Sequence, residues 1–478
     1  MENIIKQLNN TAINNLNDNK LDESEKIFEL ILKKSYIENL YFNMGNLYFK
    51  KNDLHKSVYY FEKSIEKKEL VYKSYFNIAL CYDIDSEKAI NYIQKLLKIF
   101  KKNKKLKIGN SRSDDLSRFY RILAIIYNSQ GNFKKTEDFA WNAIKYNKND
   151  LVAYQLLSEI KKASNDSEYY QKIKNILNEK NLNSDQKRIL FSILGKAEKE
   201  LGNYSESFKY YQQSNQLKNL FYLKMFNKIQ PNYKEMQNVL FNTKYDEWTK
   251  NKANSSDNYP NVVFIVGLPR SGSTLIETIL SCNKNTYCIG EYLGMTSTLN
   301  ENNLDIYFNN LKNHKILVDK QLSNFKCIPF ILNNFKNVKI INATRNPLDN
   351  ILSMFVTDIT YAQDYNSSNL ETIYNYFIFY KEVIEYWKEK FPNTIYDCHY
   401  DDLVNDPEPN IKQLIENVGF EWSENYINFN KSNNMTTSTA SSFQIRQPLY
   451  KTASKRWVNY KEFLKPIMDK LDKKNIEY

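Results

Sequence analysis

The amino-acid sequence predicts a chain of two parts, an all-α N-terminal region followed by an α/β domain with a central parallel sheet. Nine of the ten prolines lie at or after Pro260, so the first half can form uninterrupted helices. Small and aromatic residues also recur in that half with a period of about 34 residues. The apolar run at 262–266 precedes a glycine-bearing loop and a helix, which is the pattern of a buried parallel strand.

Length and charge limit the kinds of protein that this chain can be. Its 478 residues favour more than one domain, and its formal net charge of +12 favours anionic partners. The sequence contains none of the helix-turn-helix, zinc-finger or RNP patterns of nucleic-acid-binding proteins. Most lysines alternate with acidic residues, as on solvated helix faces. No nucleic-acid partner is therefore expected.

Cysteine, histidine and hydropathy patterns predict a cytoplasmic protein without a metal site. The five cysteines are odd in number and lack C-x-x-C spacing, which favours free thiols in a reducing compartment. The three histidines do not cluster, so a histidine-based metal site is not expected. Residues 1–20 carry no signal-peptide core, and no run approaches the roughly 18 apolar residues of a membrane span. No membrane partner is therefore expected.

The repeated pattern of the first half pairs a small residue with later hydroxyl and aromatic residues. One copy contains Gly45, Tyr48, Ser57 and Phe61; the others contain Ala12, Ser24 and Phe28, then Ala79 and Tyr82, then Ala124, Tyr127 and Thr136, and last Gly195, Ser207 and Tyr211. Small residues let paired helices approach closely, and aromatic residues fill the gaps. Residues 1–220 thus resemble tetratricopeptide repeat (TPR) arrays, while an irregular helical bundle is the alternative. The resemblance implies a groove that binds a polypeptide.

The predicted domain boundaries follow from these patterns. A TPR-like region covers residues 1–235, a linker covers 236–258, and the α/β domain covers 259–478. The linker lacks clear periodicity and ends in the polar loop at 254–258, immediately before the first predicted strand.

The glycine-bearing loop after the first strand is the predicted anion site. Its residues are Pro269, Arg270, Ser271, Gly272, Ser273 and Thr274. Loop amides converge in such a turn, and the dipole of the following helix favours negative charge. The spacing is similar to a Walker A motif, but Ser273 stands where ATPases carry the lysine that reaches the β- and γ-phosphates. The loop is therefore expected to hold a phosphate-like group without the usual means of neutralising a triphosphate.

The P-R-S-G-S-T sequence of this loop resembles the 5′-phosphosulfate-binding loop of sulfotransferases, which use 3′-phosphoadenosine-5′-phosphosulfate (PAPS). The motifs that follow it resemble, in order, those of tyrosylprotein sulfotransferases and their TPR-bearing bacterial relatives. The resemblance covers nearly all of residues 259–478 and, more loosely, the helical half. It implies a P-loop-like α/β sulfotransferase domain.

Two residues carry the chemistry of transfer in this resemblance. Glu291 follows a short strand predicted at 285–289, and ligands of open α/β sheets lie beyond the carboxyl ends of strands. By resemblance Glu291 is the base that takes the proton of the acceptor hydroxyl. Lys320, in the segment V-D-K-Q, resembles the family lysine that contacts the bridging oxygen of PAPS and stabilises negative charge there.

The nucleotide end of PAPS is expected near a third predicted strand, at 338–344. Arg345 follows this strand, Asn346 can cap the next helix, and Pro347 suits its first position. Arg345 and Ser353 match the arginine and serine of the family's 3′-phosphate motif. Arginine suits this role because its fork can bind phosphate through two N–H groups.

Three further residues are assigned by resemblance alone. Tyr400, in Y-D-D-L-V-N-D-P, matches a residue that lines the nucleotide site, while a core tyrosine on a strand is the alternative. Asp401 replaces the usual glutamate of that segment. Ser441, in T-A-S-S-F-Q-I-R-Q-P, matches the serine that closes over the sulfuryl group, and Arg456 matches a basic residue on the nucleotide phosphates.

Together the motifs predict transfer of a sulfuryl group from PAPS to an acceptor hydroxyl, with 3′,5′-ADP as product and no metal required. The pattern is most similar to enzymes that sulfate protein tyrosine, and a TPR array can present a polypeptide. A carbohydrate or small-molecule acceptor is the main alternative. The other two are a P-loop kinase, which would bind ATP with Mg²⁺, and a TPR scaffold whose C-terminal domain is inactive.

Overall fold

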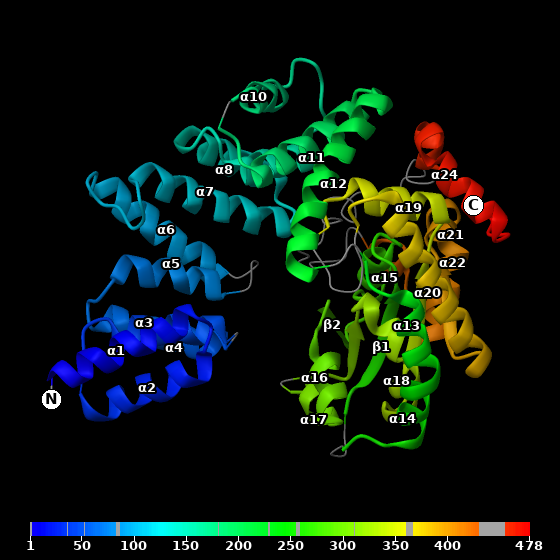
Figure 1. Ribbon diagram of the computed structural model, residues 1–478, viewed down its shortest axis with the longest axis horizontal. Helices are drawn as coiled ribbons and strands as arrows, with labels where there is room; N and C mark the ends of the chain where they lie inside the picture. Colours follow the sequence, from blue (N-terminus) through cyan, green and yellow to red (C-terminus); the bar gives the residue numbers. More distant parts are fainter. Residues whose placement is uncertain are drawn as a thin grey trace. The chain divides into compact units, whose positions relative to one another are not determined.

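The structure is a computed structural model that describes residues 2–35, 37–51, 53–82, 87–179, 181–227, 230–254, 259–309, 311–359, 367–429 and 455–478 (Figure 1). Backbone packing divides these residues into two compact units, one ending at Ile160 and the other beginning at Lys161. The second unit contains helical hairpins as well as the sheet. The predicted division at residues 235 and 258 rests on sequence patterns rather than on compactness, and it stays a prediction.

The first unit is helical throughout its regular elements, as far as the structure describes it. Its helices are α1 (Glu2–Asn17), α2 (Leu21–Lys34), α3 (Leu40–Lys50), α4 (Leu54–Glu66), α5 (Val71–Cys81), α6 (Glu87–Lys102), α7 (Arg112–Ser129), α8 (Phe133–Tyr146) and α9 (Leu151–Ile160). Successive helices pack in pairs, α1 with α2, α3 with α4, α5 with α6 and α7 with α8. The predicted helix-rich N-terminal region is therefore confirmed.

A buried serine joins the two helices of a hairpin at an equivalent place in three hairpins. The pairs are Ser24 Oγ donating to Ala12 O (2.8 Å), Ser57 Oγ to Gly45 O (2.8 Å) and Ser207 Oγ to Gly195 O (2.7 Å). In each pair the donor follows the acceptor by 12 residues. The third pair joins α11 (Ser184–Glu200) to α12 (Tyr204–Phe226) in the second unit. Each hydroxyl thus has the partner that a buried polar group requires.

The glycines of two of these hairpins leave room for an aromatic ring. A Cβ atom added to Gly45 would lie 2.5 Å from Cδ1 of Phe61, and one added to Gly195 would lie 2.9 Å from Cδ1 of Tyr211. Both rings are buried. The spacing of small and aromatic residues in the sequence therefore has a steric cause. The helical hairpins are observed, and their assignment as TPR repeats stays a prediction.

The second unit combines further helices with the sheet. Its strands are β1 (Asn261–Gly267), β2 (Thr286–Gly290), β3 (Ile316–Asp319), β4 (Lys339–Thr344) and β5 (Ile395–His399). Besides α11 and α12, its helices and helical turns are α10 (Glu168–Leu177), α13 (Tyr233–Asn238), the π-helix η1 (Val239–Lys244), α14 (Tyr245–Lys250), α15 (Ser273–Leu280), α16 (Gly294–Glu301), α17 (Leu304–Tyr307), η2 (Leu322–Cys327), α18 (Ile328–Asn334), α19 (Pro347–Val356), α20 (Leu370–Lys390), α21 (Tyr400–Asn405), α22 (Pro407–Val418), η3 (Glu424–Tyr426), η6 (Arg456–Tyr460) and α24 (Lys461–Lys473).

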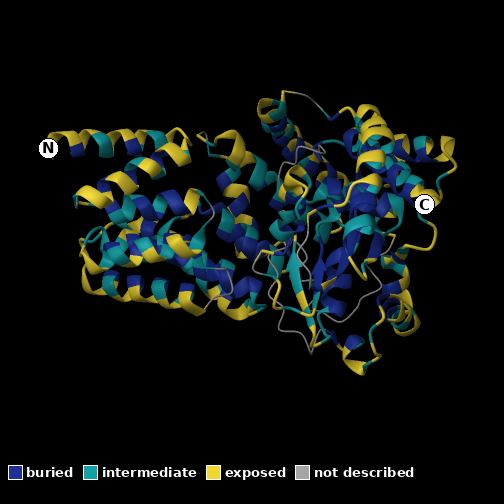
Figure 2. Cartoon of the chain, turned by 90° about the horizontal axis from the view of Figure 1, so that it is seen from below, coloured by how far each residue is buried: buried dark blue, intermediate teal, exposed yellow. Residues whose placement is uncertain are grey.

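The strands that the structure describes form one five-stranded parallel sheet in the order β2-β3-β1-β4-β5. The central strand β1 alternates its side chains between two cores. Val263 and Ile265 pack with α15 and α22, whereas Phe264 packs with α18, α19 and α20. Both faces of β1 are therefore covered by helices, and the centre of the sheet is buried in Figure 2, whereas the edge strands β2 and β5 are mostly half-buried or exposed. This explains why β1 is a continuous apolar run rather than an alternating one.

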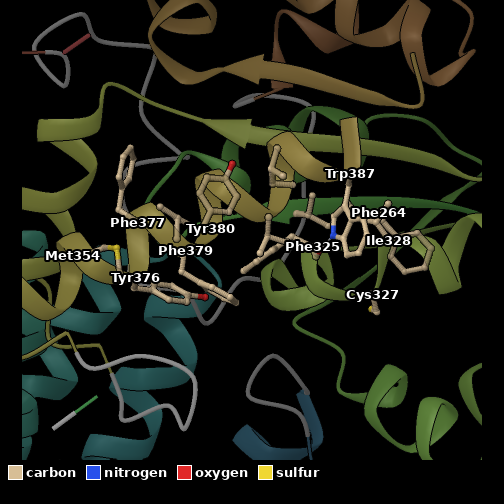
Figure 3. Close-up of a cluster of buried hydrophobic side chains, with 14 of the residues drawn as sticks. Phe264, Phe325, Cys327, Ile328, Met354, Tyr376, Phe377, Phe379, Tyr380 and Trp387 are labelled. Atoms are coloured by element: carbon tan, nitrogen blue, oxygen red, sulfur yellow. Dashed lines mark hydrogen bonds between the residues drawn. The ribbon is translucent and has the colours of Figure 1, made fainter. Parts of the chain in front are cut away.

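The larger of these two cores is rich in aromatic residues (Figure 3). Trp387 of α20 is fully buried, and its Nε1 donates to the carbonyl oxygen of Phe325 over 3.0 Å. The hydroxyl of Tyr380, also on α20, donates to Asn342 Oδ1 on β4 over 2.6 Å. Each aromatic side chain thus buries its ring and satisfies its polar atom. These bonds fix α20 against η2 and against the sheet.

Three strands agree with the sequence-based prediction. The strands predicted at 262–266, 285–289 and 338–344 are β1, β2 and β4, and the central parallel sheet is confirmed. The sequence did not predict β3 and β5 as separate strands. Strand β3 has only 4 residues, and β5 contains Asp397 and His399 and so lacks an apolar run.

The segment predicted as a linker is largely helical where the structure describes it. Helix α14 and the π-helix η1 lie within residues 236–254. The ring of Phe241 stacks on that of Tyr386 with centroids 3.9 Å apart, and Trp248 contacts Phe330 edge-on at 6.5 Å. This segment therefore belongs to the packed core of the second unit.

The described residues include no membrane-spanning helix, and their cysteines form no disulfide. None of their helices has the length and apolar character needed to cross a membrane. All five cysteines are free thiols, as the sequence predicts. Burial raises the pKa of the Cys327 and Cys398 thiols to about 12, so both act as small apolar core residues.

Gly45→Ala is expected to destabilise the protein, because the new methyl group overlaps the buried ring of Phe61. Such overpacking costs about 1–3 kcal/mol, and the higher helix propensity of alanine offsets at most about 1 kcal/mol. Urea unfolding measures the change in the free energy of unfolding between this variant and the original chain. The double variant Gly45→Ala, Phe61→Leu should recover most of the loss. A single variant as stable as the original chain would contradict the steric cause.

Candidate active site

The carboxyl ends of the strands meet at one edge of the sheet, because all five strands are parallel. A predicted site residue follows each strand there. The residues after β1, β2, β3, β4 and β5 are, in that order, the loop 269–274, Glu291, Lys320, Arg345 and Tyr400. Residues that are up to about 130 positions apart in the sequence therefore share one edge.

The loop after β1 has a backbone conformation that few residue types adopt. The dihedral angle φ is +148° at Gly267, +68° at Arg270 and +96° at Gly272. Positive φ strains a residue other than glycine, and strain of this kind concentrates at functional sites. Gly272 is the N-cap of α15, so the amides of Ser273 and Thr274 are not used by the helix's own hydrogen bonds. These amides can bind an anion.

Two glycines let this loop lie directly against the neighbouring strand ends. A Cβ atom on Gly267 would lie 2.6 Å from the carbonyl oxygen of Ala343 on β4. A Cβ atom on Gly272 would lie 2.4 Å from Cδ2 of Tyr400. Tyr400 is half-buried and is the first residue of α21, so the alternative of a tyrosine within a strand does not hold.

Residues at the end of β4 and on α19 support the loop. Asn350 Nδ2 donates to the carbonyl oxygen of Pro269 over 3.0 Å, and Arg345 Nη1 lies 3.4 Å from that of Arg270. Arg270 Nε lies 3.3 Å from Ser353 Oγ. The structure thus brings together the loop and the two residues that the sequence assigns to the 3′-phosphate motif.

Tyr400 also supports one of these arginines. The guanidinium of Arg345 lies over its ring, 4.7 Å from the ring centroid. This cation–π contact orients the plane of the guanidinium. Gly272 and Arg345 therefore pack against the same aromatic ring.

The start of α19 is formed as the sequence predicts. Asn346 caps the helix, with its Oδ1 accepting from the amide of Asp349 over 3.1 Å, and Pro347 occupies the first position. The amide of Asn346 donates to Asp401 Oδ2 over 2.9 Å. Asp401 therefore links the residues after β4 to α21 directly.

The side chain of Asp349 holds the segment that carries Arg456. Its two oxygens accept from the amides of Lys455, over 2.6 Å, and Trp457, over 2.9 Å. Burial raises the pKa of Asp349, while the bond from Trp457 and the charge of Arg345 act in the opposite direction. The half-buried Arg456 is thereby held beside the first turn of α19.

A buried lysine lies between two glutamates on the other side of β1. Lys320 Nζ donates to Glu291 Oε1 over 2.9 Å and lies 3.9 Å from Glu277 Oε2. The side chains of Lys320 and Glu277 are 2% and 1% exposed, whereas that of Glu291 is 60% exposed. Glu291 is thus the partner that solvent or an acceptor can reach.

Glu277 supplies a buried carboxyl group behind this pair. Burial raises its pKa to about 7, and the charge of Lys320 acts in the opposite direction. Its Oε1 has no hydrogen-bond partner among the residues that the structure describes. Two carboxyl groups of different exposure therefore share one ammonium group.

The neighbouring Asp319 fixes the end of β3. It accepts from the hydroxyl of Tyr307 over 2.6 Å, from the amide of Gln321 over 2.7 Å and from Asn324 Nδ2 over 3.3 Å. Burial raises the pKa of Asp319 to about 6 despite these bonds. The backbone of Lys320, the next residue, is thereby held at the strand end.

The donors around the loop fit an anion rather than a metal. Ser271 Oγ is buried and has no hydrogen-bond partner in the part of the chain that the structure describes. It lies beside Arg270 and the first amides of α15, all of which donate. Within the described ranges, no group of three or more His, Cys, Asp or Glu side chains could hold a metal ion.

Residues 295–424 match the sequence model of the family described as Sulfotransferase family. The matched part contains Lys320, Arg345, Ser353 and Tyr400, and the loop 269–274 precedes it. The C-terminal region therefore carries a sulfotransferase family domain. This match supports sulfotransfer activity of that region in general.

Two individual proteins are similar to parts of this chain. An uncharacterized protein of Aquifex aeolicus (strain VF5) is 26% identical over 247 residues, which cover 43% of this chain and 32% of the relative. The chain thus spans about a third of the length of that curated relative. The sulfotransferase domain from the Synechococcus PCC 7002 olefin synthase has 17% identity and a TM-score of 0.35, covering 44% of this chain and 91% of that domain. A likeness at this level supports no residue-by-residue comparison.

Most of the predicted site residues lie together in the structure. Arg345, Ser353 and Tyr400 lie around the loop, and Glu291 pairs with Lys320. The predicted Ser441 lies outside the described residues. The chemical roles of all these residues stay predictions.

Three residues that the sequence analysis did not single out also belong to the site. Glu277 had a recognisable signal, since it is the charged residue of an otherwise uncharged helix in which every residue is buried. Asp349 and Asn350 gave none, because each acts on a segment that is distant in the sequence.

Glu277→Gln is expected to flatten the pH dependence of stability. The pKa of Glu277 is raised from 4.5 to about 7 on folding, so the folded protein binds more protons than the unfolded protein between these values. The free energy of unfolding therefore falls as the pH rises through this range, by at most about 1.4 kcal/mol per pH unit.

Urea unfolding between pH 4.5 and 7 measures this slope. Glu416→Gln, at an exposed position of α22, is the matched control and should leave the slope unchanged. A slope in Glu277→Gln equal to that of the original chain would contradict the raised pKa.

Proposed function

We propose that this protein transfers a sulfuryl group from PAPS to an acceptor hydroxyl and releases 3′,5′-ADP. The observation that carries this proposal is the arrangement at the carboxyl edge of the sheet. The glycine-bearing loop lies there between the pair of Glu291 and Lys320, which follow β2 and β3, and the residues Arg345, after β4, and Ser353, on α19. The sulfotransferase family domain supports the same reaction class.

The loop 269–274 binds the 5′-phosphosulfate in this proposal. The half-buried Arg270 supplies positive charge, and Ser271 supplies a buried hydroxyl. The first amides of α15, at Ser273 and Thr274, supply oriented N–H donors. The absence of a Walker lysine in the sequence fits a sulfuryl group, which carries less charge than a γ-phosphoryl group.

The nucleotide end is bound by residues on the other side of β1. Arg345 and Ser353 bind the 3′-phosphate, and Arg456 adds a third polar contact. Tyr400 orients Arg345 through the cation–π contact described above. Arginine suits the binding of a phosphate, because its planar guanidinium can donate two parallel N–H hydrogen bonds to one phosphate.

Glu291 accepts a proton in this proposal, and Lys320 stabilises negative charge. The exposed carboxylate of Glu291 takes the proton from the acceptor hydroxyl, whose oxygen then forms the new bond to sulfur. The bond from sulfur to the bridging oxygen breaks, and the ammonium of Lys320 stabilises the negative charge that remains on the leaving phosphate. Ser441 completes the group by resemblance.

The acceptor that we favour is a protein tyrosine presented by the helical repeats. The helix-rich N-terminal region supports this, because stacked helical hairpins form surfaces that bind extended polypeptides. A carbohydrate or small-molecule hydroxyl is the alternative. We place the enzyme in the cytoplasm on the basis of its free thiols.

Isothermal titration calorimetry with nucleotides tests the proposed donor. Protein in EDTA should bind 3′,5′-ADP, since the donors of the site come from the chain alone. ATP with Mg²⁺ should bind much more weakly, because Ser273 replaces the Walker lysine. Tight Mg²⁺-dependent binding of ATP and none of 3′,5′-ADP would instead indicate a P-loop kinase.

Mass spectrometry of cell extract incubated with the protein and isotopically labelled PAPS identifies the acceptor. A labelled tyrosine in a polypeptide would support the favoured acceptor. Label on a carbohydrate or small molecule would replace it, and no label in any fraction would indicate an inactive scaffold.

Glu291→Gln is expected to reduce kcat about 10²–10⁴-fold, because the amide cannot accept the hydroxyl proton. The Kd for 3′,5′-ADP should stay the same, which separates catalysis from nucleotide binding. Glu301→Gln, at the exposed end of α16, is the control. Transfer of labelled sulfate to the identified acceptor measures the rate, and a kcat within about threefold of the original would exclude Glu291 as the base.

A further inference from the structure

The helical hairpin of α11 and α12 packs on the elements that carry the nucleotide end of the candidate site. Asn215 Nδ2, on α12, donates to the carbonyl oxygen of Phe355 on α19 over 2.8 Å. Ser207 Oγ lies 3.0 Å from the hydroxyl of Tyr460, the last residue of η6. Helix α12 lies beside α19 in Figure 1. The hairpin therefore touches both the helix of Ser353 and the turn of Arg456.

Lys199 lies on the face of α11 that is turned toward these elements. Arg188, on the same helix, forms an ion pair with Asp358, which follows α19. Lys199 lies three turns, or about 11 residues, further along α11, so the two side chains share one face. Helix α11 also contacts α19 directly.

The charges that act on Lys199 are mainly positive. They come from Lys196, Arg456 and Arg270, with Glu200 as the opposing carboxylate. Glu200 is itself bound to Lys196 over 2.5 Å. Burial and these like charges lower the pKa of Lys199 to about 8.

The ammonium of Lys199 has no hydrogen-bond or ion-pair partner among the residues that the structure describes. A half-buried cation beside other cations is unfavourable unless an anion offsets the repulsion. Arg270 is a residue of the loop 269–274, and its Nε contacts Ser353 on α19. It therefore connects this group of cations to the loop and to α19. The group is therefore arranged as an anion site that extends from the sheet edge onto the helical hairpin.

We propose that Lys199 binds the 3′-phosphate of the nucleotide, so that the last helical hairpin forms one wall of the nucleotide site. This inference rests on the proposed function. A phosphate with two negative charges offsets the repulsion of Lys199 by Arg270 and Arg456 and accepts hydrogen bonds from the ammonium of the lysine. It follows that the helical hairpin gives the enzyme its selectivity for donors that carry a 3′-phosphate.

Calorimetry with 3′,5′-ADP and 5′-AMP tests this assignment, because the two nucleotides differ only in the 3′-phosphate. Lys199→Met keeps the length of the side chain and removes its charge. It should raise the Kd for 3′,5′-ADP about tenfold, as expected for one charge-assisted hydrogen bond, and leave that for 5′-AMP unchanged. Lys199→Arg should retain most of the affinity for 3′,5′-ADP.

Lys187→Met, at an exposed position of the same helix, controls for net charge and should change neither Kd. The thermal midpoint of ligand-free Lys199→Met should equal or exceed that of the original chain, because the like-charge repulsion is removed. A lower midpoint would mean that the lysine supports the fold and would overturn the assignment.

Two further outcomes separate this inference from the proposed function. If the original chain binds 3′,5′-ADP and Lys199→Met binds it equally well, or loses both nucleotides equally, Lys199 is not a ligand of the 3′-phosphate and the proposed function stands. If the original chain does not bind 3′,5′-ADP, the proposed function fails and this inference with it.

Discussion

The parallel direction of the five strands is the constraint on which the candidate site depends. It puts the carboxyl end of every strand at one edge, where each strand is followed by a charged residue, an aromatic residue or the glycine-bearing loop. Close packing of this loop is possible because Gly267 and Gly272 lie within touching distance of β4 and Tyr400. In the proposed function, the central position of β1 leaves one neighbouring strand for proton transfer and the other for nucleotide binding.

Charge is arranged differently on the two sides of the loop. On the β3 side Lys320 is compensated by Glu291 and Glu277, so this part of the site is balanced within the chain. On the β4 side the like charges of Arg270 and Arg456 act on Lys199. An anionic ligand on that side therefore both neutralises the cations and joins the helical hairpin to the sheet. In this account the hairpin of α11 and α12 contributes to donor binding.

Much of this arrangement could be predicted from the sequence, because the signals are local. The apolar run of β1, the cap at Asn346 and the spacing of Gly45 from Phe61 each depend on neighbouring residues. Strand β3 has only 4 residues, and β5 contains two polar residues and lacks an apolar run. The roles of Asp349 and Lys199 depend on contacts between segments that are distant in the sequence, and no local pattern marks them. The family lysine and arginine positions were found by resemblance, and the structure supplies their geometry.

A crystal structure of the protein with 3′,5′-ADP tests the central claim most directly. The account predicts the 5′-phosphate at the loop 269–274 and the 3′-phosphate among Arg345, Ser353 and Lys199, with the loop backbone unchanged. A nucleotide bound elsewhere on the chain, or a loop filled by its own side chains in the presence of saturating nucleotide, would contradict it.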